Sequence, residues 1–243
     1  MAELQPFKDL YSPQSVGRLG QYIRKVYPQF QKDKFEKVVF DKGWKEKELK
    51  QRMRHITLSL NQFLPASFKE SSAVLIDCVM QMRKEGIESL GIEFLSLPDY
   101  IEVFGIDDYK SSVKAIDVIT QFISCEFAVR PFIIKYGDKM LQQMDAWGSH
   151  KNHKVRRLAT EGCRPRLPWG MALPALKKDP SAILPLLERL KDDEHEWVRL
   201  SVANNLNDIS KDNPDTVLKL FKKWHGKSKN ADWVIKHASR TLL

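Results

Sequence analysis

The sequence has few cysteines, and they are not arranged as a disulfide framework or a metal site. Only three occur, Cys78, Cys125 and Cys163, widely separated and odd in number. We interpret them as reduced side chains of the core. The six histidines also fail to cluster at the spacing of metal ligands, so no metal is expected.

Other signals are missing as well. No stretch is long and apolar enough to span a bilayer, and the N-terminus lacks the basic-then-apolar order of a secretory signal. Neither a phosphate-binding glycine loop nor a Ser/His/Asp order is present. These absences argue against a membrane partner and a cofactor, and we expect a cytoplasmic protein.

The chain also lacks alternation of period two, so no strands are expected, whereas the helical period recurs throughout. Apolar residues at helical spacing predict helices at 13–28, 34–41, 46–63, 71–84, 90–96, 98–104 and 109–124. The predicted fold class is therefore all-α.

From about residue 131 the helical pattern repeats. Three helices begin near Met140, Ile183 and Val217, and each ends in a bulky residue. Their partner helices start with similar triplets at 154–156, 197–199 and 233–235. Spacings of 43 and 36 residues bracket those of HEAT-type helical pairs. This pattern predicts an α-α superhelix, a solenoid of HEAT-like repeats, with the second helices lining its concave side. No low-complexity linker interrupts it, so we expect one domain over residues 1–243.

The charge balance favours a polyanionic partner. Forty Lys and Arg outnumber 31 Asp and Glu, giving a net charge of +9, which suits nucleic acid first. Many soluble proteins are mildly basic, however, so charge alone does not establish that the chain binds nucleic acid.

The most informative stretch runs from His153 to Gly170. A basic helix ends at Glu161, and Gly162 can supply a left-handed stop. An irregular arm follows, Arg164 to Gly170, whose two prolines exclude a helix interior or a central strand. A stiff arm carrying two arginines and Trp169, placed next to a carboxylate, is typical of a binding-site wall.

The predicted second helices would form a basic groove with a few acids set into it. The basic residues can neutralise phosphates, whereas acids would repel them, so retained acids suggest chemistry. Glu126, Glu161 and Asp208, with Trp169, suit a cationic substrate, because carboxylates and an aromatic face both attract positive charge.

Each of these residues also has a purely structural interpretation. Glu161 could pair with a neighbouring arginine, and Asp208 could cap local backbone. Trp169 could pack between repeats, and Glu126 could pair with Arg130. The residues alone leave these alternatives open.

At these positions the sequence resembles a known family. The segments RRLATEGCRPRLPWG, at 156–170, and EWVRLSVANNLNDISKDNP, at 196–214, resemble the HEAT-like-repeat DNA alkylation repair glycosylases, the AlkC branch more than AlkD. Some members of that branch carry a C-terminal immunoglobulin-like domain. The chain ends at Leu243, and we expect the form without it.

The resemblance implies a monofunctional DNA-3-methyladenine glycosylase, a hydrolase that excises N3-methylated bases, chiefly 3-methyladenine and also 3-methylcytosine. It implies Asp208, Glu161 and Glu126 as catalytic acids and Trp169 as the residue that contacts the base. Asp208 is our first choice for the acid that acts on the sugar. Seven basic residues are predicted to bind DNA: Arg156, Arg157, Arg164, Arg166, Arg199, Lys236 and Arg240.

The partner implied is double-stranded DNA containing alkylated bases, bound by a monomer in the bacterial cytoplasm and used at the nucleoid. Two alternatives stay open. One is a non-catalytic DNA-binding solenoid that recognises damaged or branched DNA, for which the acids would be dispensable. The other is a protein-interaction scaffold, which would show little salt-sensitive affinity for duplex DNA.

Overall fold

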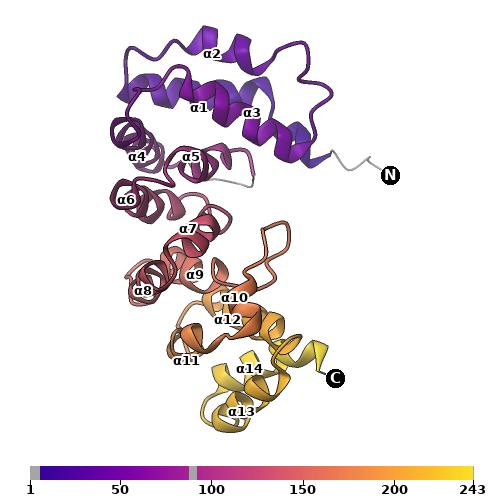
Figure 1. Ribbon diagram of the computed structural model, residues 1–243. Coiled ribbons are helices and arrows are strands. Elements are labelled where there is room, and N and C mark those ends of the chain that lie inside the picture. The colour runs from indigo at the N-terminus through magenta and orange to yellow at the C-terminus, as the bar shows by residue number, and fades with distance from the viewer. Residues whose placement is uncertain (1–5, 88–91, 243) are drawn as a thin grey trace. The chain divides into compact units, whose positions relative to one another are not determined.

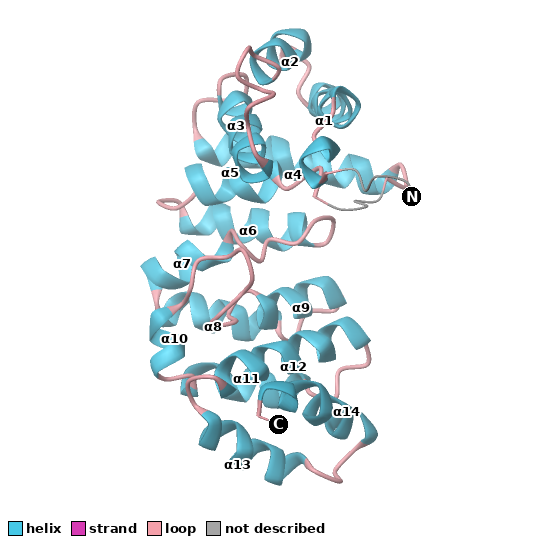
Figure 2. Cartoon of the chain, turned by 90° about the vertical axis from the view of Figure 1, so that its right-hand side faces the viewer, coloured by secondary structure: helices cyan, strands magenta, loops and turns pink. Residues whose placement is uncertain are grey.

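The computed structural model describes residues 6–87 and 92–242, and every regular element in this part of the chain is helical (Figures 1 and 2). The all-α prediction is confirmed. The chain divides into two compact units, Met1–Ala128 and Val129–Leu243, and each is described separately here. Among the described residues, no helix combines the length and apolar character needed to cross a membrane.

The first unit contains one short 3₁₀ helix and six α-helices. They are η1 (Phe7–Leu10), α1 (Pro13–Val26), α2 (Lys32–Val39), α3 (Leu49–Asn61), α4 (Phe68–Lys84), α5 (Ser96–Phe104) and α6 (Tyr109–Thr120). Helix α4 packs against both α1 and α6, and α3 packs against α5. The predicted helices at 13–28 and 109–124 are correct in type, but the observed helices α1 and α6 end two and four residues before the predicted ends.

One short helix of the prediction is absent. Of the stretch 90–96, residues 90 and 91 lie outside the described residues, and 92–95 form turns before α5 begins at Ser96. Phe94 and Leu97 are fully buried, so the apolar residues in this stretch fill the core from a turn. Apolar spacing over so few residues does not distinguish these two local structures.

The second unit is a series of helical pairs. Its elements are α7 (Val129–Tyr136), α8 (Asp138–Trp147), α9 (His153–Glu161), α10 (Pro174–Lys178), η2 (Ser181–Ile183), α11 (Leu184–Leu190), α12 (Glu196–Ser210), α13 (Pro214–Trp224), α14 (Lys229–Ala238) and η3 (Ser239–Thr241). The three predicted repeats are confirmed as the pairs α8/α9, α11/α12 and α13/α14.

The second helices of these pairs lie side by side, because α12 packs against α9 and against α14 (Figure 2). A side chain caps the start of each: Asn152 for α9, His195 for α12 and Ser228 for α14. Five apolar residues of α12 are fully buried, Val198, Val202, Ala203, Leu206 and Ile209. Burial of each large side chain among them contributes about 1.5–3 kcal/mol to the free energy of unfolding. Because α12 also packs against both neighbouring helices, it forms the core of the second unit.

The three cysteines are buried and free, as predicted for core side chains. Burial is the main cause that raises the pKa of the Cys78 and Cys163 thiols to about 12. They are therefore poor nucleophiles in the folded chain.

Candidate active site

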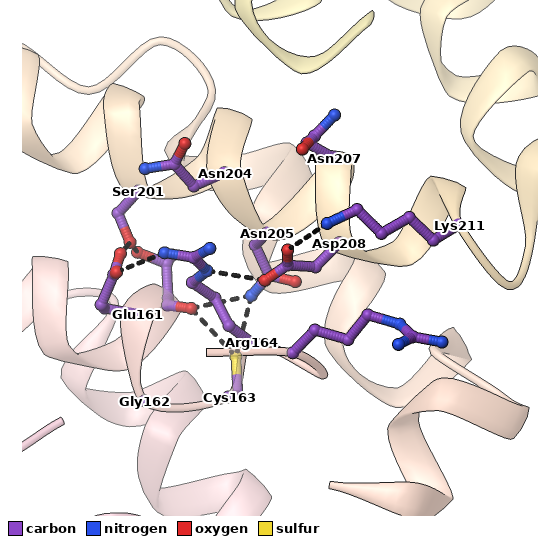
Figure 3. A network of polar contacts seen from close by, with 12 residues as sticks. Glu161, Gly162, Cys163, Arg164, Ser201, Asn204, Asn205, Asn207, Asp208 and Lys211 are labelled. Carbon is purple, nitrogen blue, oxygen red and sulfur yellow. Dashed lines mark hydrogen bonds and ion pairs between the residues drawn. The ribbon is translucent and has the colours of Figure 1, made fainter. Parts of the chain in front are cut away.

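A compact cluster of charged side chains joins α9, the arm that follows it and α12. Arg164 lies between two carboxylates: its Nη1 donates to Glu161 Oε1 at 2.7 Å, and its Nε donates to Asp208 Oδ2 at 2.8 Å (Figure 3). All three side chains are buried, with between 2% and 7% of each residue exposed. The sequence places Arg164 and Asp208 44 residues apart, and the packing of α9 against α12 brings them together.

The local chain explains the position of each member. Glu161 is the last residue of α9, and Arg164 follows three residues later at the start of the arm. Asp208 is in the last turn of α12, on the same helical stripe as Ser201, which faces Glu161. The three charges therefore meet at the C-terminal ends of two packed helices.

The two carboxylates differ in how far their oxygens are engaged. Glu161 Oε1 accepts from Arg164 and lies 3.7 Å from the Arg157 guanidinium, while Oε2 accepts from the Ser201 hydroxyl at 2.6 Å. Within the described residues, Asp208 Oδ1 has only a long contact, 3.5 Å from Lys211 Nζ. Asp208 thus retains an oxygen with spare acceptor capacity, whereas both oxygens of Glu161 hold short hydrogen bonds.

The Arg164 guanidinium is a permanent cation in this setting. Desolvation is the largest single influence and would lower its pKa, but the hydrogen bond to Asp208 and the attraction of both carboxylates outweigh it, and the pKa is raised. Breaking a buried ion pair by removing one partner costs about 3–5 kcal/mol, so the cluster also holds α9 and α12 together.

A chain of buried hydrogen bonds continues from Glu161 through Ser201 to neighbouring polar groups. Thr160 Oγ1 lies 2.7 Å from Ser201 Oγ, and Asn205 donates to the Thr160 carbonyl at 2.7 Å. All three are buried. The sequence reasoning missed Ser201 and Thr160. For Ser201 the signal was present in the spacing of Ser201, Asn205 and Asp208, which repeats every three or four residues along one face of α12. Thr160, on α9, has no such signal.

The arm is anchored by a residue that the sequence reasoning treated only as a partner of Glu126. Arg130 is fully buried, and it donates through Nη1 to the Gly162 carbonyl at 3.0 Å and through Nε to the Met171 carbonyl at 2.5 Å. It therefore fastens both ends of the arm. Gly170 packs against it, since an added Cβ would lie 3.2 Å from Arg130 Cδ.

The prediction of a left-handed stop at Gly162 is wrong. Its φ of −65° is ordinary for a helix. Glycine is needed there for space instead, because a Cβ would lie 2.5 Å from Val129 Cγ2 and 2.9 Å from Met144 Cε. The described non-glycine residue with a left-handed backbone is Trp169, whose φ is 63°. Such a backbone in a bulky residue is strained and is often found at functional sites.

Trp169 extends the arm into solvent, with 63% of its surface exposed. That exposure does not fit the structural alternative in which it packs between repeats. It belongs to the second unit, as do Glu161 and Asp208. Glu126 belongs to the first unit, where it is half-buried and accepts from the Ser124 hydroxyl at 2.8 Å. Its place beside the other two acids stays a prediction.

Three of the arginines predicted to contact phosphate are engaged with protein acceptors. Arg164 holds the two carboxylates. Arg156 binds Asp193 through two hydrogen bonds of 2.6 and 3.0 Å, and Arg199 donates to the carbonyls of Asp193 and Glu194. The last two fix the loop between paired helices. The donors that make these bonds are not available to a phosphate in this structure.

The other predicted DNA-binding residues are more accessible. Arg166, Lys236 and Arg240 are exposed, and Arg157 is half-buried. Arg166 makes a two-bond ion pair with Asp212, at 2.9 and 2.7 Å, and Arg240 donates to Asn204 at 2.8 Å. Lys236 lies on α14, Arg240 lies on η3 directly after it, and Arg157 lies on α9. No group of three or more His, Cys, Asp or Glu within the described ranges could hold a metal ion.

Comparison with known proteins gives consistent results. The chain is 44% identical over 243 residues to the uncharacterized protein YhaZ of Bacillus subtilis (strain 168), covering all of this chain and 65% of that protein. It superposes with a TM-score of 0.90 and 34% identity on the Pseudomonas fluorescens alkylpurine DNA glycosylase AlkC bound to DNA containing an abasic site analog. That match covers 98% of this chain and 64% of the glycosylase. The chain thus spans less than two thirds of the length of each relative.

The model of one protein family, described as DNA alkylation repair enzyme, matches residues 42–242. The match includes α9, the arm and α12, and therefore every member of the charged cluster. The resemblance inferred from the two sequence segments is confirmed, and the chain belongs to the DNA alkylation repair enzyme family.

Proposed function

We propose that this chain is a monofunctional DNA glycosylase that excises cationic N3-methylated bases, 3-methyladenine first and 3-methylcytosine second. Its family membership and its likeness to an alkylpurine DNA glycosylase support hydrolysis of an N-glycosidic bond. The observation that carries the proposal is the pair of buried carboxylates, Glu161 and Asp208, held by one guanidinium within a chain of net charge +9.

The chemistry fits this substrate because methylation at N3 puts a positive charge on the base. When the bond between that base and C1′ breaks, the base takes the electron pair and leaves as a neutral molecule. No strong general acid is needed. What the protein must stabilise is the oxocarbenium-like sugar, and what it must orient is a water molecule.

Asp208 is suited to both tasks. Its Oδ1, which contacts Lys211 only at 3.5 Å, can face the positive C1′ and accept the proton of the attacking water. The water then forms the new bond to C1′ and leaves an abasic sugar in the DNA. Glu161, with both oxygens hydrogen-bonded, supplies negative charge from a fixed position. Trp169 offers an exposed aromatic face to the cationic base.

The experiment is to incubate the protein with methylated duplex DNA and to identify the bases released. We expect release of 3-methyladenine and no release of 7-methylguanine. Correctly folded protein that releases no alkylated base would contradict the proposal and would favour a DNA-binding solenoid without activity.

Substitution of Asp208 tests its role directly. Asp208→Asn keeps the shape and removes the charge, so the rate of base release should fall by a factor of about 100 or more, with DNA affinity nearly unchanged. The control is Asp212→Asn, which makes the same change four residues further along the chain, at an ion pair on the surface. Equal rates for the two variants would contradict this role of Asp208.

A further inference from the structure

We propose that Arg164 is a positioning residue of the reaction: it holds Glu161 and Asp208 in register and sets the charge around Asp208, and it does not bind phosphate. This inference rests on the proposed glycosylase function and assigns to Arg164 a role different from the DNA contact predicted from the sequence.

The first support is geometric. The guanidinium is planar and its donors are fixed, so bonds from Nε to Asp208 and from Nη1 to Glu161 define the relative orientation of both carboxylates. The bond to Asp208 uses Oδ2 and thereby fixes the direction of Oδ1, the oxygen with spare capacity. Arg164 therefore determines where Asp208 points without occupying the oxygen that would act.

The second support is burial. Only 7% of Arg164 is exposed, and its side chain is enclosed between α9 and α12 (Figure 3). Arg166, two residues further along the same arm, is exposed and bound to Asp212 at the surface. The arm thus carries one arginine turned inward and one turned outward. A phosphate can approach the second far more readily than the first.

The third support is the local charge. Two carboxylates and one guanidinium leave one negative charge, whereas loss of the guanidinium would leave two. The other charged groups that face Asp208 are few. Lys211, directly after α12, contacts Oδ1. Arg157 of α9 lies 3.7 Å from Glu161 Oε1, and Arg166 of the arm interacts with Asp208 through its charge. From η3, Arg240 donates to Asn204. Arg164 is thus the main cation for both acids.

The test is the dependence of single-turnover base release on pH for three variants. Arg164→Gln should lower the maximal rate on the order of 100-fold, because the carboxylates lose their orientation. It should also move the acid limb of the profile to higher pH, because the site then holds two carboxylates with no guanidinium between them. The concentration that half-saturates the single-turnover rate should change little.

The other two variants separate charge from geometry. Arg164→Lys keeps the cation but loses the fixed pair of donors, so the acid limb should stay near that of the parent while the rate falls. The double variant Arg164→Gln with Glu161→Gln again leaves one negative charge, and its acid limb should return toward that of the parent. An arginine with only a structural role would produce neither pattern.

Two controls make the result decisive. Arg166→Gln changes the neighbouring arginine of the arm and should leave the acid limb in place, whatever its effect on DNA binding. Arg189→Gln removes an exposed pair with Asp145 and should leave both rate and profile unchanged. An acid limb that does not move in Arg164→Gln would overturn the proposal. A rise in the half-saturating concentration alone would overturn it too, because that change is expected when a phosphate contact is lost.

The positioning role can be tested even if no base is released. At a fixed neutral pH, the carbon-13 chemical shift of the Asp208 carboxyl should differ between Arg164→Gln and the parent chain, because the variant lacks the hydrogen bond from the guanidinium to Oδ2. If the parent chain releases no base but Arg164→Gln differs from it in this measurement, the proposed function is contradicted and the effect of Arg164 on Asp208 stands. If the parent chain is active but Arg164→Gln does not differ from it in this measurement, only the inference about Arg164 is overturned.

Discussion

At the scale of single residues, the exposed tryptophan of the arm combines two unusual properties. Trp169 has a left-handed backbone, with φ of 63°, and most of its surface faces solvent. Left-handed geometry costs a residue with a Cβ about 1–2 kcal/mol, and an exposed side chain recovers little of this by burial. The arrangement is consistent with a residue retained for binding.

This argument predicts the outcome of two substitutions. Trp169→Gly relieves the strain, whereas Trp169→Ala keeps it, so the alanine variant should be less stable than the glycine variant by about 1 kcal/mol. Chemical denaturation measures the difference. Both variants should lose base-release activity to a similar extent. A glycine variant less stable than the alanine variant would show that the backbone at this position is not strained.

At the scale of elements, the contacts between helices of the first unit include one that is sensitive to acid. Glu85, at the end of α4, accepts hydrogen bonds from Lys25 and Tyr22 of α1 and from Gln81. These bonds, that of Lys25 foremost, lower the pKa of the Glu85 carboxyl to about 2. The carboxylate therefore links the C-terminal ends of α1 and α4.

The sign of the pH dependence follows from this shift. The folded pKa lies below the unfolded value near 4.5, so the stabilisation is complete above about pH 4.5 and is lost as the pH falls toward 2. Glu85→Gln should therefore unfold at a lower temperature than the parent at pH 7, and the difference should shrink between pH 4.5 and 2. Thermal unfolding monitored by circular dichroism measures this. A difference that stays constant with pH would contradict the assigned role.

At the scale of the whole molecule, the net charge of +9 predicts an affinity for duplex DNA that falls steeply with salt. Each neutralised phosphate contributes about −0.9 to the slope of log affinity against log salt. With about four such contacts, affinity should fall on the order of 100-fold between 50 and 200 mM salt.

Lys236 provides a single-residue test of this estimate. It is exposed on α14, and Lys236→Gln should make the slope less steep by about one unit while weakening binding to all sequences equally. Fluorescence anisotropy with a salt series measures both. The control is Lys223→Gln on α13, where the lysine pairs with Glu188 at 2.6 Å. If both variants kept the slope of the parent, α14 would not contact the phosphates.

Comparison of the sequence with the structure shows which kinds of inference succeed. The periodicity predicted the helices and the three pairs of the second unit, because a buried stripe leaves its mark on every turn. The arm at Arg164 to Gly170 was also predicted, since its two prolines exclude regular structure. Glu161 and Asp208 were selected because acids in a basic region are unusual.

The partners of the arginines could not be predicted in the same way. Nothing in the sequence distinguishes Arg156, Arg164 and Arg199 from one another. All three are basic residues near a helix that is expected to face DNA. Their acceptors lie on loops or on a helix up to 44 residues away, and only the packing of successive pairs determines which arginine turns inward. The place of Glu126 also depends on tertiary arrangement and stays a prediction.

The anchoring of the arm by Arg130 has one further consequence. Because the same guanidinium holds the carbonyls of Gly162 and Met171, the eight residues between them form a loop whose two stems are fastened at a single point. A break in the backbone near the tip of this loop, around Pro168, would leave each new end tied to Arg130. The chain could therefore be given new termini there, by circular permutation or by proteolytic nicking, without releasing α9 or the segment that leads to α10.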